Sequence, residues 1–257
     1  RWLLYYTDNE LIRGIFDWIT TMMVPGHIFE VPAPMPFAML QRTKGFRDMV
    51  VPPRGHMVNM EGLAKAVRAN GDVWVNCPAK QILVAGKEAK GLVVEKDGSE
   101  VKIASRVVIS DAGPKATVLL AGVDNFDEEY LRRMRVELKS ASATMCFVAS
   151  DRSLWPEDGS PATLNIVGAR RLISAIPLSN ISPEYAPPGQ HLMFAFGCAV
   201  SNYVHMDTEE EQRQCLLDLK ELFPLFEKHG RVLKWVFRDF GAELPFQRSR
   251  TGEGMPC

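Results

Sequence analysis

The residue types that most often carry enzyme chemistry form no recognisable catalytic motif in this sequence. The patterns G-x-S-x-G, H-E-x-x-H and G-x-x-x-x-G-K-[ST] are absent, and so is an EF-hand loop. The histidines are far apart along the chain, so each alone is interpreted as structural or exposed, although two could still meet in space. We therefore assign no catalytic acid, base or nucleophile from the sequence. The histidines are His27, His56, His191, His205 and His229.

The cysteines and the paired charges also suggest structure more than chemistry. The five cysteines show no C-x-x-C spacing, so we expect buried, reduced thiols and no metal site. Such thiols favour a reducing compartment. Asp151-Arg152 and Arg170-Arg171 are open to two interpretations, a surface or mutual charge pair and an anion site. The cysteines are Cys77, Cys146, Cys198, Cys215 and Cys257.

Composition limits the function classes. The chain has 257 residues, of which 46% are hydrophobic and 24% charged, which is typical of a globular protein. A net charge of −1 argues against a nucleic-acid partner, because such binding needs an excess of Lys and Arg. The sequence contains no apolar run of the ~18 to 20 residues that span a membrane. We therefore expect a cytoplasmic protein that is soluble or at most peripherally bound to a membrane.

The hydrophobic pattern predicts an α+β fold, with a mixed or antiparallel sheet, helices and a β-meander. Residues 31–37 contain too many prolines for regular structure and are expected to form an irregular apolar loop. Helices are predicted over 8–23, 59–70, 114–121, 127–136 and 208–229, the last with a Thr208–Glu211 capping box and a kink at Pro224. Strands are predicted over 73–75, 81–85, 91–96, 101–104, 107–109, 143–149, 163–167, 171–177, 191–200 and 232–237.

In the helix after Asn59, apolar spacing predicts an inner face formed by Met60, Leu63, Ala64 and Val67. Around this helix, the order of segments from Val51 to Leu120 resembles that of the phytoene desaturases and amine-oxidase-like flavoproteins. Two positions differ from the family pattern, because His56 replaces a glycine and Ala79 replaces the usual valine. The segments that carry the resemblance are Pro53-Arg54-Gly55-His56, Asn70 to Val75, Ala79 to Ile82, Gly91 to Gly98 and Ala104 to Pro114.

The resemblance implies FAD as the cofactor and a meander that belongs to a glutathione-reductase-type FAD domain. It also implies a division into residues 1–50 (helical part of a substrate-binding domain), 51–112 (part of the FAD domain) and 113–257 (sheet and helices of the substrate-binding domain). The chain then resembles the interior of such an enzyme, without the glycine fingerprint before Arg1 or the second flavin motif after Cys257. We expect it to hold FAD poorly on its own. The implied cofactor contacts are Gly55, Ala79, Ser110, Asp111 and Ala112.

The resemblance further implies an oxidoreductase that desaturates, saturates or isomerises an apolar, polyene or carotenoid-like molecule. Four phenylalanines, Phe37, Phe147, Phe194 and Phe196, are candidates to line the substrate pocket, and they also fit a plain core. Residues 37–51 could contact a membrane or form a solvated loop. Two alternatives stay open, a non-catalytic ligand-binding or interaction domain and an enzyme of another class with His and Asp residues assembled in space. The oligomeric state is also open.

Overall fold

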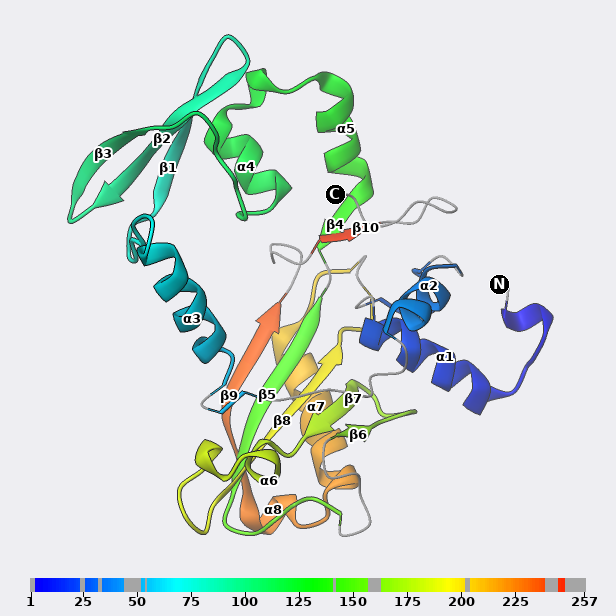
Figure 1. Ribbon diagram of the computed structural model, residues 1–257. Coiled ribbons are helices and arrows are strands. Elements are labelled where there is room, and N and C mark those ends of the chain that lie inside the picture. The colour runs from blue at the N-terminus through cyan, green and yellow to red at the C-terminus, as the bar shows by residue number, and fades with distance from the viewer. Residues whose placement is uncertain are drawn as a thin grey trace. The chain divides into compact units, whose positions relative to one another are not determined.

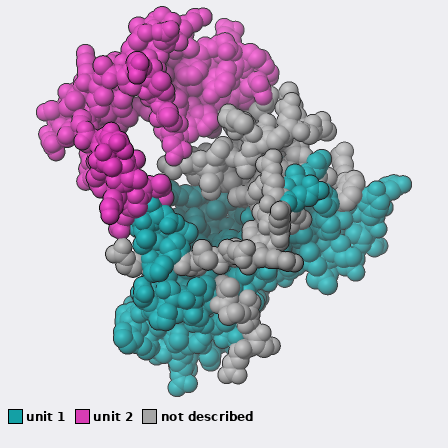
Figure 2. All heavy atoms as spheres, in the orientation of Figure 1, with its two compact units in different colours: residues 1–59, 139–257 teal, residues 60–138 magenta. Residues whose placement is uncertain are grey.

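The chain forms two compact units (Figures 1 and 2). Unit 1 comprises Arg1–Asn59 and Lys139–Cys257, and unit 2 comprises Met60–Leu138. Both combine helices with antiparallel strands, which confirms the predicted α+β class. The predicted division at residues 51 and 113 separates substrate-binding parts from an FAD-binding part, and it stays a prediction. The computed structural model describes residues 3–23, 26–31, 34–43, 52–53, 55–140, 142–156, 163–201, 204–238 and 245–247.

A five-stranded antiparallel sheet lies at the centre of unit 1, with the strand order β6-β7-β8-β5-β9 (Figure 1). Four strands were expected to pair here, and the strand predicted over 232–237 joins them as an edge strand beside β5. The strands are β5 (Ala143–Ser150), β6 (Leu164–Asn165), β7 (Leu172–Ile176), β8 (His191–Cys198) and β9 (Gly230–Arg238).

One face of this sheet forms the core of unit 1. Side chains alternate between the two faces of a strand, so Cys146 and Val148 of β5 point to the same side. Both are 0% exposed and join the same buried cluster as Cys215 and Leu219 of helix α7 (Thr208–Leu222), which are also 0% exposed. Helix α7 therefore covers this face, and the opposite face carries Phe147 and its neighbours.

The ends of α7 differ from the prediction. Asp207 is the N-cap, because its carboxylate accepts hydrogen bonds from the backbone N–H groups of Glu209 and Glu210. The predicted Thr208–Glu211 capping box is therefore wrong, and Glu211 pairs with Arg171 instead. The helix stops at Leu222, and Pro224 separates it from the short helix α8 (Phe226–His229) rather than kinking one long helix.

Helix α1 (Glu10–Met23) confirms the predicted first helix. The side chain of Asn9 accepts hydrogen bonds from the N–H groups of Leu11 and Ile12, as an N-cap does. Trp18 Nε1 donates to Ile173 O at 2.9 Å and so attaches the helix to β7. The short helix η1 (Leu3–Tyr5) precedes α1.

The prediction of an irregular loop over 31–37 is wrong in its second half, because α2 (Pro34–Thr43) begins there. Pro34 and Pro36 lie in the first helical turn, where the missing N–H groups would have no partner within the helix. The remaining elements of unit 1 are short. They are α6 (Leu178–Ile181), η3 (Pro183–Tyr185), and β10 (Pro245–Gln247), which pairs with β4 (Leu138–Ser140).

Unit 2 is built on the predicted β-meander, with the order β1-β2-β3. Both connections are tight turns that need positive φ, at Gly86-Lys87 (61° and 65°) and Asp97-Gly98 (52° and 76°). Helix α4 packs against β1. The elements are α3 (Met57–Arg68), β1 (Ala79–Ala85), β2 (Glu88–Lys96), β3 (Ser99–Ala104), α4 (Pro114–Ala121), η2 (Val123–Asn125) and α5 (Glu128–Glu137).

Several apolar segments of unit 2 lack the partners that their patterns predict. Residues 73–75 and 107–109 form no strand, because no described residue offers them a hydrogen-bonded neighbour. The predicted inner face of α3 is exposed, with Leu63 at 61% and Val67 at 51%. These predictions are wrong for the described chain, because an apolar pattern becomes an inner face only where another element covers it.

Candidate functional site

Three of the four predicted pocket phenylalanines meet on one face of the five-stranded sheet. The ring centroids of Phe147 and Phe194 are 5.1 Å apart, and those of Phe194 and Phe196 are 5.4 Å apart. Both distances lie in the range that favours aromatic pairing. All three side chains are half-buried and lie on the face opposite the α7 core. We call Phe147, Phe194 and Phe196 the sheet phenylalanine cluster.

The surroundings of this cluster are mainly apolar. In the strand register, Met145 pairs with Phe196 and Ile176 pairs with Phe194, and directly opposite residues share a face. Lys234 of the edge strand β9 pairs with Phe147 and is exposed. The cluster is therefore suited to contact an apolar molecule, with one cation at the sheet edge.

Phe37 lies elsewhere in unit 1. It belongs to α2, and its ring centroid is 6.1 Å from that of Phe16 on α1. Both rings line a cavity of about 450 Å³ to which none of the sheet phenylalanines contributes. The structure therefore brings three of the four predicted pocket residues together and places the fourth in a separate cavity.

A half-buried histidine–aspartate pair is one feature of unit 1 that the sequence did not reveal. His27 Nδ1 lies 3.0 Å from Asp17 Oδ2, and His27 Nε2 lies 2.7 Å from Ala199 O. A carbonyl oxygen can only accept, and so can an ionised carboxylate, so both ring nitrogens carry a proton. The ring of His27 also stacks on Phe29 at a centroid distance of 5.4 Å. This geometry is that of an imidazolium whose two N–H groups both have an acceptor.

The titration of the pair agrees with this geometry. Burial alone lowers the pKa of His27, but the hydrogen bonds to Asp17 and to Ala199 O outweigh it and raise the pKa overall. For Asp17, burial raises the pKa, and the hydrogen bonds from His27 and the Ile28 N–H bring it below its usual value. The ten-residue separation of the two residues follows no common motif, so only the fold brings them together.

Glu30 completes this group and is 3% exposed. Its carboxylate accepts a hydrogen bond from the backbone N–H of His27 at 3.0 Å and another from Ser201 Oγ at 2.7 Å. Asp17 Oδ1 accepts from the Ile28 N–H at 2.7 Å. We call Asp17, His27 and Glu30 the His27 cluster. Its hydrogen bonds attach residues 26–31 to α1 and to the end of β8, and so hold this segment in place.

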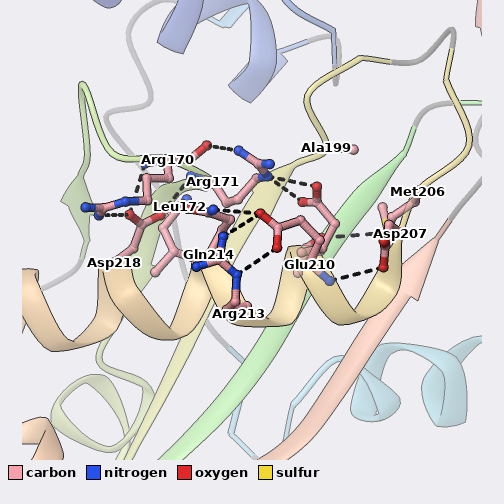
Figure 3. A network of polar contacts seen from close by, with 12 residues as sticks. Arg170, Arg171, Leu172, Ala199, Met206, Asp207, Glu210, Arg213, Gln214 and Asp218 are labelled. Carbon is pink, nitrogen blue, oxygen red and sulfur yellow. Dashed lines mark hydrogen bonds and ion pairs between the residues drawn. The ribbon is translucent and has the colours of Figure 1, made fainter.

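A second charge network joins the loop before β7 to α7 (Figure 3). The buried carboxylate of Asp218 accepts hydrogen bonds from the backbone N–H groups of Arg170, Arg171 and Leu172 at 3.0, 2.7 and 3.0 Å. Arg170 also pairs with Glu221, and Arg171 pairs with Glu211. Both arginines are therefore paired with carboxylates, which supports the charge-pair interpretation over an anion site.

The remaining titratable residues add little chemistry. Burial raises the pKa of Cys146 and of Cys198 to about 12, and it also raises that of Cys215, so these thiols stay neutral. Their predicted burial is confirmed, and Cys77 is half-buried. His229 pairs with Asp151 at 2.8 Å. Among the described residues, no group of three or more His, Cys, Asp or Glu side chains could hold a metal ion.

Four of the five predicted cofactor contacts lie on the surface of unit 2. Ala79 begins β1, and Ser110, Asp111 and Ala112 follow an extended segment that belongs to no strand. Their small side chains and accessible backbone suit contact with a flat ring or a phosphate chain. All four residues are exposed to solvent, and their role as cofactor contacts stays a prediction.

Gly55, the fifth predicted contact, lies in unit 1. Its φ of 82° favours glycine, and its N–H donates to Pro52 O at 3.0 Å to close a turn. His56 does not have a positive φ, so a histidine is accommodated at this position without strain. Tyr185 Oη also donates to Pro52 O at 2.7 Å.

Comparison with known proteins assigns the family. The family described as flavin containing amine oxidoreductase matches residues 35–254. This chain belongs to that family. FAD is the cofactor of the family, and the sheet phenylalanine cluster and the unit 2 surface both fall within the matched residues of this amine oxidoreductase chain. No curated protein matches the sequence.

Several solved structures share the fold of this chain. An oxidoreductase from Methanosarcina mazei is 24% identical, with a TM-score of 0.81 over 98% of this chain and 57% of its own. A protein from Pyrococcus furiosus is 18% identical, with a TM-score of 0.73 over 92% of this chain and 56% of its own. Cyclohexylamine oxidase from Brevibacterium oxydans is 14% identical, with a TM-score of 0.61 over 96% of this chain and 55% of its own.

The amine oxidoreductase chain therefore spans a little over half the length of these structures. Within the described part of the chain, no helix is both long enough and apolar enough to cross a membrane.

Proposed function

We propose that this chain carries the substrate side of an FAD-dependent oxidoreductase that acts on an apolar small molecule. The observation that carries the proposal is the sheet phenylalanine cluster, three half-buried rings on a sheet face that the α7 core does not use. Such a face suits a molecule without charge, because desolvating a charged group there would be unfavourable. Desaturation, saturation or isomerisation of a polyene or similar molecule is the reaction class that we propose.

Unit 2 would contact the cofactor. We propose that the backbone around Ala79 and residues 110–112 lies against one side of the flavin nucleotide, and that Gly55 is a further cofactor contact. The accessible backbone of these residues and the family assignment support this role. FAD, when bound, supplies a hydride acceptor or donor. The residues of this chain bind and orient the substrate and exclude water from it.

The first experiment tests whether the protein binds FAD. The protein encoded by the complete reading frame is purified, and its absorbance spectrum is recorded with and without added FAD. We expect the spectrum of bound flavin. A colourless protein that is indifferent to FAD would overturn the proposal, and if it still bound apolar molecules it would be a non-catalytic ligand-binding protein.

The second experiment asks whether the cluster contacts the substrate. A panel of polyenes and apolar amines is screened for flavin reduction without oxygen, and Phe194→Ala and Phe194→Leu are compared on the best substrate. We expect Phe194→Ala to raise KM roughly tenfold, because about 1.4 kcal/mol of apolar contact is lost, and Phe194→Leu to raise it less.

A matched control is available on the same sheet. Phe237 pairs with Thr144 of β5, which is on the α7 side, so Phe237→Ala removes a ring from the opposite face. It should leave KM close to that of the parent protein. Equal effects of Phe194→Ala and Phe237→Ala on KM would show that the cluster is core and not a substrate surface.

Location and membrane contact remain predictions from the sequence. A cytoplasmic location, with peripheral membrane contact through residues 37–51, would suit an enzyme for apolar molecules. Residues 44–51 lie outside the described chain. Co-sedimentation of the protein with anionic lipid vesicles tests the contact.

A further inference from the structure

A second apolar site lies in unit 1, between α1, α2 and residues 26–31. It is the cavity of about 450 Å³ that Phe37 lines, a volume in the range of small-molecule sites. Its walls come from four stretches of chain, which makes it more than a groove along one helix. The lining residues are Leu3, Leu4, Arg13, Phe16, Thr20, Ile28, Phe29, Val31, Pro36 and Phe37.

The cavity contains one cation among apolar side chains. Eight of the ten lining residues are Leu, Ile, Val, Phe or Pro, and the other two are Arg13 and Thr20. Thr20 Oγ1 already donates to Asp17 O at 2.8 Å, so its hydrogen-bonding capacity is largely used within α1. The guanidinium of Arg13 forms no hydrogen bond or ion pair with any residue that the structure describes.

Arg13 differs in this respect from Arg170 and Arg171, the two arginines of the network on α7. Arg170 and Arg171 are neutralised by Asp218, Glu221 and Glu211, whereas Arg13 has five planar donors and no described acceptor. A guanidinium at an apolar wall favours an anion, because the pair forms charge-assisted, often bidentate hydrogen bonds. The remainder of such a ligand would then contact the phenylalanine and leucine side chains.

One wall of the cavity is held in place by the His27 cluster. Residues 28, 29 and 31 line the cavity, and the hydrogen bonds of Asp17, His27 and Glu30 fix the backbone between them. The stacking of Phe29 on the His27 ring adds a further constraint. A preformed wall lowers the entropy cost of binding a small ligand.

We propose that this cavity binds an amphipathic anion, an apolar chain or ring with one carboxylate that pairs with Arg13. The site is distinct from the sheet phenylalanine cluster, and the inference does not rest on the flavin reaction. It can therefore fail or hold independently of the proposed function.

The test is calorimetric titration of the full chain with decanoate and with decanol, which differ in charge and share an apolar chain. We expect decanoate to bind more tightly, and Arg13→Met to raise its Kd about tenfold or more, since a hydrogen bond to a charged group is lost. Arg13→Lys should retain part of the affinity, because the charge stays and the planar fork is lost. Arg152→Met removes an exposed arginine outside the cavity and serves as the control.

Phe37→Ala separates the apolar contribution from the charge. Its side chain is 38% exposed, so the substitution leaves the core intact. It should raise the Kd values of decanoate and decanol by a similar factor. Urea midpoints of all variants confirm folding. Equal Kd values for Arg13→Met and the parent chain, equal binding of decanoate and decanol, or no effect of Phe37→Ala on either ligand would each overturn the proposal.

Discussion

The five-stranded sheet of unit 1 and two segments of unit 2, helix α3 and residues 107–109, all have apolar patterns, but they bury their side chains to different extents. In unit 1, Val148 and Leu219 are 0% exposed because α7 covers one sheet face. In unit 2, Leu63 is 61% exposed and Ile109 is 92% exposed. An apolar pattern thus identifies which face seeks burial, and only the structure shows whether a partner covers it.

Fluorescence can follow the two units separately. Trp74 is the only tryptophan in residues 60–138, so a Trp74→Phe chain reports on unit 1 alone. This background is used for the unit 1 variants below. If the comparison is correct, equivalent substitutions cost unit 1 several times more stability than unit 2.

The largest effect is expected for Asp218→Ala. The substitution leaves the N–H groups of residues 170–172 without their acceptor and removes one of the two carboxylates that pair with Arg170, so the free energy of unfolding should fall by about 4 kcal/mol. Urea unfolding of unit 1 measures it. Asp218→Asn, which keeps one carbonyl acceptor, should cost less, and equal losses for the two variants would contradict the hydrogen-bond explanation.

Leu219→Ala is expected to rank next. The side chain is 0% exposed in the core cluster, and a buried Leu→Ala change typically costs about 2–5 kcal/mol through lost contacts and a residual cavity. We expect about 3 kcal/mol in unit 1 from the same urea measurement. A loss below about 1 kcal/mol would mean that the core readily closes around the gap.

His27→Gln should have a smaller and pH-dependent effect. The pKa of His27 is raised in the fold, so its contribution is complete below its ordinary value of 6.5 and is lost as pH rises through the raised value. Asp17 has a lowered pKa, so its contribution is present above 3.8 and is lost as pH falls further. We expect a loss of about 1–2 kcal/mol near pH 6, since Asp17 is partly exposed.

Urea unfolding of the parent and His27→Gln chains between about pH 5 and pH 9 checks this. The difference between the two chains should shrink toward the alkaline end. Asp17→Asn provides the control, because combining it with His27→Gln should add little to either change alone. A difference that stays constant across this range would show that the ring is not charged in the fold.

The smallest effect is expected for Leu63→Ser in unit 2. An exposed position away from any cap or network changes stability by about 0.5 kcal/mol or less. The difference between the tryptophan signals of the parent background and the Trp74→Phe background isolates Trp74 and so follows the unfolding of unit 2. A loss above about 2 kcal/mol would mean that the α3 face is covered in solution, and the contrast between the units would then fail.

Prediction from sequence was most successful where local chemistry decides the outcome. The first helix and the β-meander formed as predicted, because the Asn9 cap and the Asp97-Gly98 turn each act within a few residues. Three of the four candidate pocket phenylalanines lie together on the sheet, and their role in binding substrate stays a prediction. The family resemblance, carried by residues 51–120, agreed with the family found by comparison.

Prediction from sequence failed where the structure depends on residues that are far apart along the chain. Asp17 and His27 meet through a turn that no motif specifies, and Asp218 accepts from N–H groups more than forty residues away. Glu211 looked like part of a capping box and instead pairs with Arg171. Residues 107–109 have the composition of a strand, yet a strand also needs a neighbour with free hydrogen-bonding groups.

The unequal burial of the thiols has a practical consequence for chemical labelling. Maleimide dyes react with accessible thiolates, and Cys146, Cys198 and Cys215 of unit 1 are buried and protonated. In a Cys257→Ser chain, a dye would attach preferentially to the half-buried Cys77 of unit 2. With Trp74→Phe added, a single bright probe on unit 2 and intrinsic tryptophan emission from unit 1 would then allow one sample to reveal whether the two units unfold together or in turn.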